Sequence, residues 1–309
     1  MTSTHVGILF LLLFATAQGV RDAYFGNVFQ SVSFFFVALL AFGTSTIVFL
    51  AWSLIRKPGD VARLFAEPGN LFVVNATTAA AWLLFFFGLR NLEPAVVATL
   101  FNGIGPLVVL VSSWIGWTSD RNNLGGLEKA LYICLAVTLT CLCAIVLSNA
   151  SGLQISNMEM QLLALAGVIF GGAMITTSYV YTRAMTDRGI GSDAVMGVRF
   201  FLTLLIALAM EIGTGDAAYR PTPQLIPILA GSAFLLIVIP SCLVQSGVSR
   251  TSPLLANVFR ALGPVCVFGF QQFDGRLQFS GATLACIIAF SAITIAASLI
   301  RGWRESNPT

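Results

Sequence analysis

Two apolar stretches of this 309-residue chain carry polar residues at helical spacing. The residues are Thr99, Asn102 and Pro106 in one stretch, and Asn257, Arg260 and Pro264 in the other. Positions i, i+3 and i+7 share one face of a helix, so each stretch would present its polar residues together. A guanidinium keeps its proton and pairs with carboxylate or phosphate through two parallel hydrogen bonds. The stripes therefore predict a binding site for a small anionic or zwitterionic molecule.

Arg260 is the most informative of these residues. It lies about eight residues into its apolar stretch, or ~12 Å along a helix, where a charge costs at least ~2.5 kcal/mol. No carboxylate is expected at the same depth. Glu93 and Glu211 lie near the outer ends of their stretches, and Asp274 lies just past the ninth stretch. The bound molecule could therefore supply the counter-charge. The alternative is a structural Arg260 that bonds helix carbonyls or snorkels toward the headgroups.

Other polar residues within apolar stretches are weaker candidates. Asn257 and Thr99 are expected to donate hydrogen bonds beside Asn102 and Arg260. Gln18 and Asn75 could line the same site or could bond a neighbouring helix. Arg199 is expected to be structural, because it lies within snorkelling reach of a membrane surface.

Two Gly-Pro pairs mark positions where a gate could bend. They are Gly105-Pro106 and Gly263-Pro264. Proline removes a backbone donor and kinks a helix, so these pairs are the expected hinge or gate residues. The alternative is a static curve in each helix.

Composition excludes most catalytic chemistries. Charged residues make up 9% and AVILMFWYC residues 57% of the chain, and the mean hydropathy is +0.89. His5 is the one histidine, and neither Lys57 nor Lys129 follows a phosphate-binding glycine loop. The six cysteines form no C-x-x-C pair. We therefore expect no enzyme activity, no metal site, no cofactor and no nucleic-acid partner.

The apolar stretches predict an all-α integral membrane protein with ten spans, because a span needs ~20 apolar residues. Each span must be a helix, because lipid offers no hydrogen-bond partner for backbone N–H and C=O groups. The stretches are 6–20, 32–54, 70–89, 94–117, 130–148, 161–182, 194–212, 225–247, 253–273 and 279–300. With both termini in the cytoplasm, ten basic residues lie inside and four outside. The outer four are Arg21, Arg90, Arg220 and Arg276.

An internal repeat divides the chain into two halves. Residues 98–107 (ATLFNGIGPL) and 256–265 (ANVFRALGPV) are identical at four positions, including the Gly-Pro pair. The matched stretches are the fourth and the ninth spans. Because the repeat unit has five spans, the second copy enters the membrane from the other side. The predicted halves are 1–148, with loop 118–129 leading into its fifth helix, and 149–309 with a short cytoplasmic tail. Inverted repeats of this kind meet around a site near the bilayer midplane.

This pattern resembles the drug/metabolite transporter superfamily in its EamA-like branch. The resemblance covers essentially the whole chain and is carried by the two five-span halves and by three motifs. These are 91–98 (NLEPAVVA) leading into Gly105-Pro106, 251–253 (TSP) leading into Gly263-Pro264, and 198–200 (VRF). The family's second and seventh helices often carry an Arg-Phe pair, and the first half departs from this with 33–36 (SFFF).

The resemblance implies a secondary transporter of a small organic metabolite that works by alternating access. Its partners would be this substrate and the lipid bilayer, with no obligate protein partner, and a bacterial inner membrane is the expected location. The first span, read as 6–20, contains no acid, which argues against proton-driven efflux of lipophilic cations. An exporter of neutral metabolites or drugs with a structural Arg260 is the main alternative. A channel and a membrane-embedded lipid enzyme are more remote ones.

Overall fold

A computed structural model describes residues 3–114, 125–154, 157–214, 221–248, 250–251 and 253–306. Every regular element in these ranges is a helix, which confirms the all-α class. The helices are α1 (Ser3–Val28), α2 (Phe34–Arg56), α3 (Pro58–Phe65), α4 (Pro68–Asn91), α5 (Pro94–Trp114), α6 (Gly126–Leu147), α7 (Met158–Asp187), α8 (Ser192–Val198), α9 (Phe201–Thr214), α10 (Leu225–Ala233), η2 (Phe234–Val238), α11 (Ile239–Val248), α12 (Pro253–Gln271) and α13 (Gly281–Ser306).

Eight helical segments among the described residues are long and apolar enough to cross a membrane. They fall on eight of the ten predicted stretches, from His5–Val28 to Gly281–Arg304. The fourth and ninth stretches contain the shorter apolar helices Pro94–Val108 and Leu255–Gln271. The chain is therefore a multi-pass integral membrane protein. Arg220 and most of the predicted loop 118–129 lie outside the described residues.

The first helix is longer than predicted, and this is a correction. We expected the span to end near residue 20, with Arg21 in an outer loop, but α1 continues to Val28. Arg21 and Asp22 are therefore within the helix and buried, 7% and 0% exposed. An ion pair between these neighbours lets the helix continue through two charges. The expectation of a first span without an acid was wrong.

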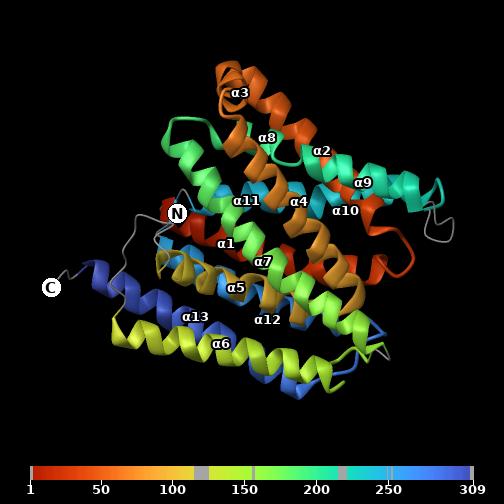
Figure 1. Cartoon of the computed structure of the whole chain (residues 1–309), viewed down its shortest axis with the longest axis vertical. Helices are drawn as coiled ribbons and strands as arrows, with labels where there is room; N and C mark the ends of the chain where they lie inside the picture. Colours follow the sequence, from red (N-terminus) through yellow and green to blue (C-terminus); the bar gives the residue numbers. More distant parts are fainter. Residues whose placement is uncertain are drawn as a thin grey trace.

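Figure 1 shows the helices as one bundle, with α6 and α13 side by side at one edge and α2 and α9 at the other. Between these edges, α1 packs against α11 and α12, whereas α7 packs against α4 and α5. The helices α5 and α12 also contact each other in the middle of the bundle. The largest apolar core contains aromatic side chains in contact, among them Phe25, Phe42, Phe85 and Phe86, of which Phe42 and Phe86 are stacked.

Glycines allow α7 to approach its partners closely. A Cβ atom at Gly172 would lie 2.6 Å from the backbone oxygen of Phe101 on α5, and one at Gly171 would lie 3.2 Å from the backbone oxygen of Ala81 on α4. Backbone atoms cannot move aside as a flexible side chain can. These two glycines therefore set the spacing of α7 from both α4 and α5.

Two of the predicted spans are not continuous α-helices. The seventh is broken at Arg199-Phe200, between α8 and α9. The eighth contains the π-helical turn η2 between α10 and α11, which ends two residues before Pro240. Proline lacks the backbone N–H that would continue the ladder, and π-helical turns of this kind often occur at functional positions.

Candidate functional site

The helices α5 and α12 face each other along the stripes that the sequence singled out. At one end, which we call the closed end, Ala95 and Ala98 of α5 belong to the same buried cluster as Val267 and Phe268 of α12. All four side chains are at most 5% exposed, with Phe268 at 5% and the others at 0%. This end of the interface is therefore packed and dry.

Toward the other end of α5 and α12, polar residues of both helices are partly or fully exposed, and we call this the accessible end. On α5, Asn102 and Pro106 follow the buried Ala95 and Ala98 on one face but are partly exposed. On α12, Asn257 and Arg260 are exposed. Polar residues on both helices are therefore more exposed here than the residues at the closed end.

Arg260 is an exposed cation on an otherwise buried face of α12. It shares its helix face with Ala256, Pro264 and Val267, at i−4, i+4 and i+7, and all three are buried. Its side chain is exposed, and it makes no hydrogen bond, ion pair or ring contact with any described residue. The guanidinium is therefore available to a ligand.

Asn102 and Thr99 differ in what they can offer. Thr99 is fully buried, and its hydroxyl donates to the Ala95 carbonyl at 2.6 Å. Asn102 donates from Nδ2 to the Ala98 carbonyl at 2.8 Å, and its Oδ1 has no partner among the described residues. In this conformation Asn102 can accept a hydrogen bond from a ligand, whereas the Thr99 hydroxyl is occupied.

Gln18 and Asn75, the two other predicted site residues, lie in different places. The amide of Gln18 on α1 lies beside Gly263 of α12, where its Oε1 would be 3.3 Å from an added Cβ. Gln18 therefore borders the α5–α12 interface. Asn75 instead joins α4 to the broken seventh span, because its Oδ1 accepts from the backbone N–H of Leu202 at 3.1 Å. This bond satisfies a donor at the start of α9 and gives Asn75 a structural role.

The two Gly-Pro pairs lie within continuous helices. Pro106 is inside α5 and Pro264 is inside α12. Gly105 leaves room for Thr176 of α7, whose Oγ1 would be 3.0 Å from an added Cβ. Gly263 makes the corresponding room for Gln18. Pro106 thus belongs to the accessible end of α5, whereas Pro264 lies between Arg260 and the closed end of α12.

Arg199 is structural, but it does not snorkel as predicted. Its side chain is 4% exposed, and Nη2 donates to the hydroxyls of Thr78 on α4 and Ser178 on α7, at 3.1 and 2.9 Å. These hydroxyls bond each other at 2.8 Å. The hydroxyl acceptors hold the guanidinium inside the bundle, away from the headgroups, and so tie three helices together.

Sequence reasoning missed the buried pair Arg21 and Asp22 on α1. Arg21 Nε donates to Asp22 Oδ1 at 2.7 Å. Its guanidinium carbon lies 5.4 Å from the ring centre of Trp82 and 5.6 Å from that of Phe85. The apolar positions Phe25 and Phe29, spaced four residues apart beyond this pair, were the signal that the helix continues.

A buried carboxylate fastens the closed end. Glu93 precedes α5 and accepts hydrogen bonds from Gln271 Nε2 at 2.6 Å, the Gly152 N–H at 2.7 Å and Thr283 Oγ1 at 3.1 Å. Gln271 Oε1 accepts in turn from the Ala95 N–H at 2.9 Å. Burial raises the pKa of Glu93 above its ordinary value, and the three hydrogen bonds offset part of that rise. The network joins the start of α5 to the end of α12 and the start of α13.

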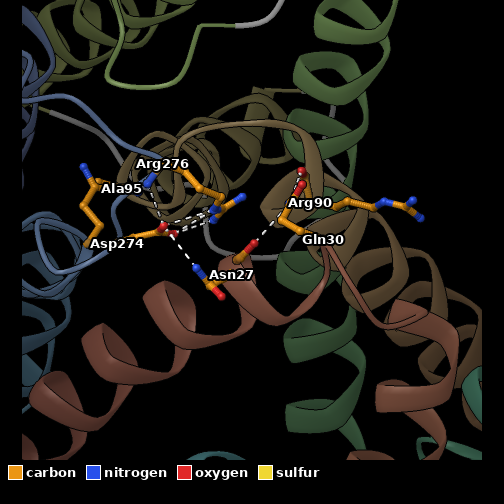
Figure 2. A network of polar contacts seen from close by, with 8 residues as sticks. Asn27, Gln30, Arg90, Ala95, Asp274 and Arg276 are labelled. Carbon is orange, nitrogen blue, oxygen red and sulfur yellow. Dashed lines mark hydrogen bonds and ion pairs between the residues drawn. The ribbon is translucent and has the colours of Figure 1, made fainter. Parts of the chain in front are cut away.

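Figure 2 shows a second polar group, at the end of α1. Asn27 of α1 donates to Asp274 Oδ1 at 3.1 Å, and Arg276 pairs with the same carboxylate. Nearby, Gln30 donates to the Arg90 carbonyl at 2.8 Å. Partial burial acts to raise the pKa of Asp274, but hydrogen bonds from Arg276 and Asn27 hold it below its ordinary value. The end of α1 is thereby attached to the segment after α12.

Comparison with known proteins supports the fold alone. No family model and no curated protein matches the chain. A solved structure described as "Crystal structure of protein" matches with a TM-score of 0.63 and 16% sequence identity, over 97% of this chain and 98% of that chain. The two chains therefore share a fold over nearly their whole lengths.

Proposed function

We propose that this protein is a secondary transporter of a small organic metabolite, anionic or zwitterionic, that works by alternating access. In this proposal ten spans form two inverted five-helix halves, residues 1–148 and 149–309, as in the EamA-like transporters that the sequence resembles. The cargo binds between α5 and α12, and both termini lie in the cytoplasm of a bacterial cell.

The exchange of packing partners supports the inverted halves. The first helix of one half, α1, packs against α11 and α12. The first helix of the other half, α7, packs against α4 and α5. Each first helix therefore contacts the third and fourth spans of the other half. This is the relation expected for two equivalent halves that interlock.

The observation that carries the proposal is the partner-free guanidinium of Arg260 on an interface that is sealed at one end. A buried cluster and the Glu93 network close one side, while Asn102, Asn257 and Arg260 are accessible on the other. A binding residue that can be reached from one side only is the arrangement expected for one state of an alternating-access cycle. With the termini inside, the accessible end faces the cytoplasm.

Transport by Arg260 variants tests the proposal. Liposomes containing the purified chain would be assayed for saturable uptake and exchange of a panel of acidic and zwitterionic metabolites. We expect Arg260→Ala to lower transport at least ~10-fold, because a charge-assisted pair contributes more than ~1.4 kcal/mol. Arg260→Lys should retain part of it. Arg183→Ala removes an exposed arginine from the end of α7 and should have no effect. Wild-type rates in both Arg260 variants would overturn the proposal.

A further inference from the structure

The hydrogen bonds around Glu93 cross between the two proposed halves of the chain. Glu93 belongs to the first half, whereas the three donors to its carboxylate, on Gly152, Gln271 and Thr283, belong to the second. Gly152 approaches so closely that an added Cβ would lie 3.2 Å from Cδ of Glu93. The Glu93 side chain is thereby enclosed, and the residue is 1% exposed. These contacts must break if the halves separate at the closed end.

No cation neutralises this carboxylate among the residues that the structure describes. Its three hydrogen bonds come from neutral groups. The charged residues that the neighbouring elements carry near this end are Arg21 and Asp22 on α1, Arg90 on α4, and Asp274 and Arg276 after α12. The two on α1 pair with each other, as do the two after α12. Burial without a counter-charge disfavours the ionised form of a carboxyl group relative to the neutral acid.

The hydroxyl of Thr283 lets the network hold Glu93 in either protonation state. It carries one hydrogen and lies 3.1 Å from both Glu93 Oε2 and Ser280 Oγ. Ser280 donates its own hydrogen to the Ala150 carbonyl at 2.8 Å, so its oxygen can accept from Thr283. When Glu93 is ionised, the Thr283 hydroxyl donates to Oε2. When Oε2 carries the proton, it donates to Thr283 Oγ1, and the Thr283 hydrogen turns to Ser280, because a hydroxyl rotates and both donates and accepts.

We propose that protonation of Glu93 controls the closed end: the protonated carboxyl group keeps this end closed, and loss of the proton favours its opening. The inference rests on the proposed transport function and adds a control of that function by pH. In the closed form the ionised carboxylate is buried among neutral donors, whereas in the open form water solvates it. The proton is therefore held more tightly in the closed form, and opening releases it to the water outside.

The direction of the effect follows from the pKa of Glu93 in the two forms. Burial raises this pKa above 4.5 in the closed form, and contact with water brings it back toward that value in the open form. Below pH 4.5 the carboxyl group is protonated in both forms, and opening is least favoured. As the pH rises through the raised pKa, only the closed form still holds the proton, so opening becomes more favourable.

Cysteine accessibility at the closed end tests this inference in the full-length chain. In proteoliposomes of a variant whose six native cysteines are replaced, Ala98→Cys places a thiol in the buried cluster, where Ala98 is 0% exposed. Phe273→Cys places a reference thiol after α12, on a residue that is 87% exposed. A membrane-impermeant thiol reagent would be added outside at a series of pH values, equal on both sides of the membrane. The reference corrects for the pH dependence of the thiol reaction itself.

We expect the labelling rate at position 98, divided by that at position 273, to rise as the pH rises from 4.5 through the raised pKa of Glu93. The rise should be at least ~10-fold, because a proton held ~10-fold more tightly in the closed form changes the equilibrium by the same factor.

Variants assign the pH dependence to the network. Glu93→Gln should keep the ratio low at every pH, because its amide stays neutral and can donate to Thr283 Oγ1. Ser280→Ala removes the second acceptor for the Thr283 hydroxyl and so disfavours the protonated form, which should move the rise to lower pH. The matched control Glu159→Gln neutralises an exposed carboxylate at the start of α7 and should leave the profile unchanged.

Three results would overturn the inference: a ratio that does not change with pH when Glu93 is intact, no labelling at position 98 at any pH, or a rise that persists in Glu93→Gln. The first two use the chain with Glu93 intact, so they stand even if the variant does not fold. Saturable, Arg260-dependent transport together with a ratio that does not change with pH would overturn this inference alone and leave the proposed function supported.

Discussion

At the scale of single residues, the interior is organised by charges that lack conventional partners. Arg199 is buried against hydroxyl groups, Arg21 pairs with its own neighbour in the chain, and Arg260 is exposed without a partner. In the proposed function, Arg260 is therefore the cation with which an anionic group on the cargo would pair.

The hydroxyls around Arg199 should be important for stability. Thr78→Val keeps the shape of the side chain but removes the oxygen that accepts from Nε and Nη2 of Arg199. Leaving a buried charged donor unsatisfied costs about 1–3 kcal/mol or more, so the unfolding midpoint in detergent should fall. Thr140→Val on α6 is the control, because that exposed hydroxyl bonds only within its own helix. Equal midpoints for the two variants would contradict this role.

Glu93 should give the stability a specific pH dependence. Its pKa in the folded protein is raised above the ordinary value of 4.5 by burial, with hydrogen bonds from Gly152, Gln271 and Thr283 offsetting part of the effect. The folded state therefore binds this proton more tightly than the unfolded state. The stabilisation is fully present below pH 4.5 and is lost as the pH rises through the raised pKa.

The unfolding midpoint as a function of pH measures this effect. As the pH rises from 4.5 through the raised pKa of Glu93, the midpoint of the wild type should fall relative to that of Glu93→Gln, whose amide does not titrate. Glu159→Gln, at an exposed carboxylate at the start of α7, should keep the wild-type curve. Parallel curves for wild type and Glu93→Gln would rule out the proposed titration.

At the scale of elements, close helix contacts should be sensitive to single methyl groups. Gly172→Ala places a Cβ 2.6 Å from the backbone oxygen of Phe101, so α7 and α5 must move apart at a cost of about 1–3 kcal/mol. Gly231→Ala in α10 has no atom within 4 Å of the new Cβ and should be neutral or slightly stabilising. Thermal unfolding of both variants compares them directly, and equal stabilities would contradict this account of the contact.

The apolar pattern predicted most of the helices, because lipid makes apolar length the dominant constraint on a span. The same pattern could not predict that α1 continues through Arg21 and Asp22. Their tolerance depends on the rings of Trp82 and Phe85, which lie about sixty residues away in the chain and are brought near by the fold alone.

The candidate site was predictable in part, because helical spacing gives the face of a helix that a residue occupies. Asn102 and Pro106 lie on one helix, as do Asn257 and Arg260, and their neighbourhood on a helix face follows from sequence distance. Helical spacing could not assign Asn75, whose partner Leu202 lies on another helix. Nor could it reveal that the Thr99 hydroxyl is occupied by the Ala95 carbonyl.

At the scale of the whole molecule, the proposed function depends on the interface between α5 and α12. This interface is packed at its closed end and is proposed to be in contact with water at its accessible end. The helices α5 and α12 contribute matched stripes, and the Glu93 network holds the sealed side. In the proposed function, an exposed residue on these stripes faces water, whereas an equally exposed residue on the rim of the bundle faces lipid. This difference separates a transport pathway from a lipid-facing surface.

Cysteine labelling in sealed vesicles tests this distinction most directly. In a variant whose six native cysteines are replaced, Asn257→Cys on α12 would be compared with Val137→Cys on α6, which is 56% exposed on the outside of the bundle. A charged, membrane-impermeant thiol reagent reacts with thiols in contact with water. The account predicts rapid labelling at position 257 from the cytoplasmic side alone, and none at 137. Equal protection of both cysteines from either side would place Asn257 and Arg260 in lipid and contradict the proposed pathway.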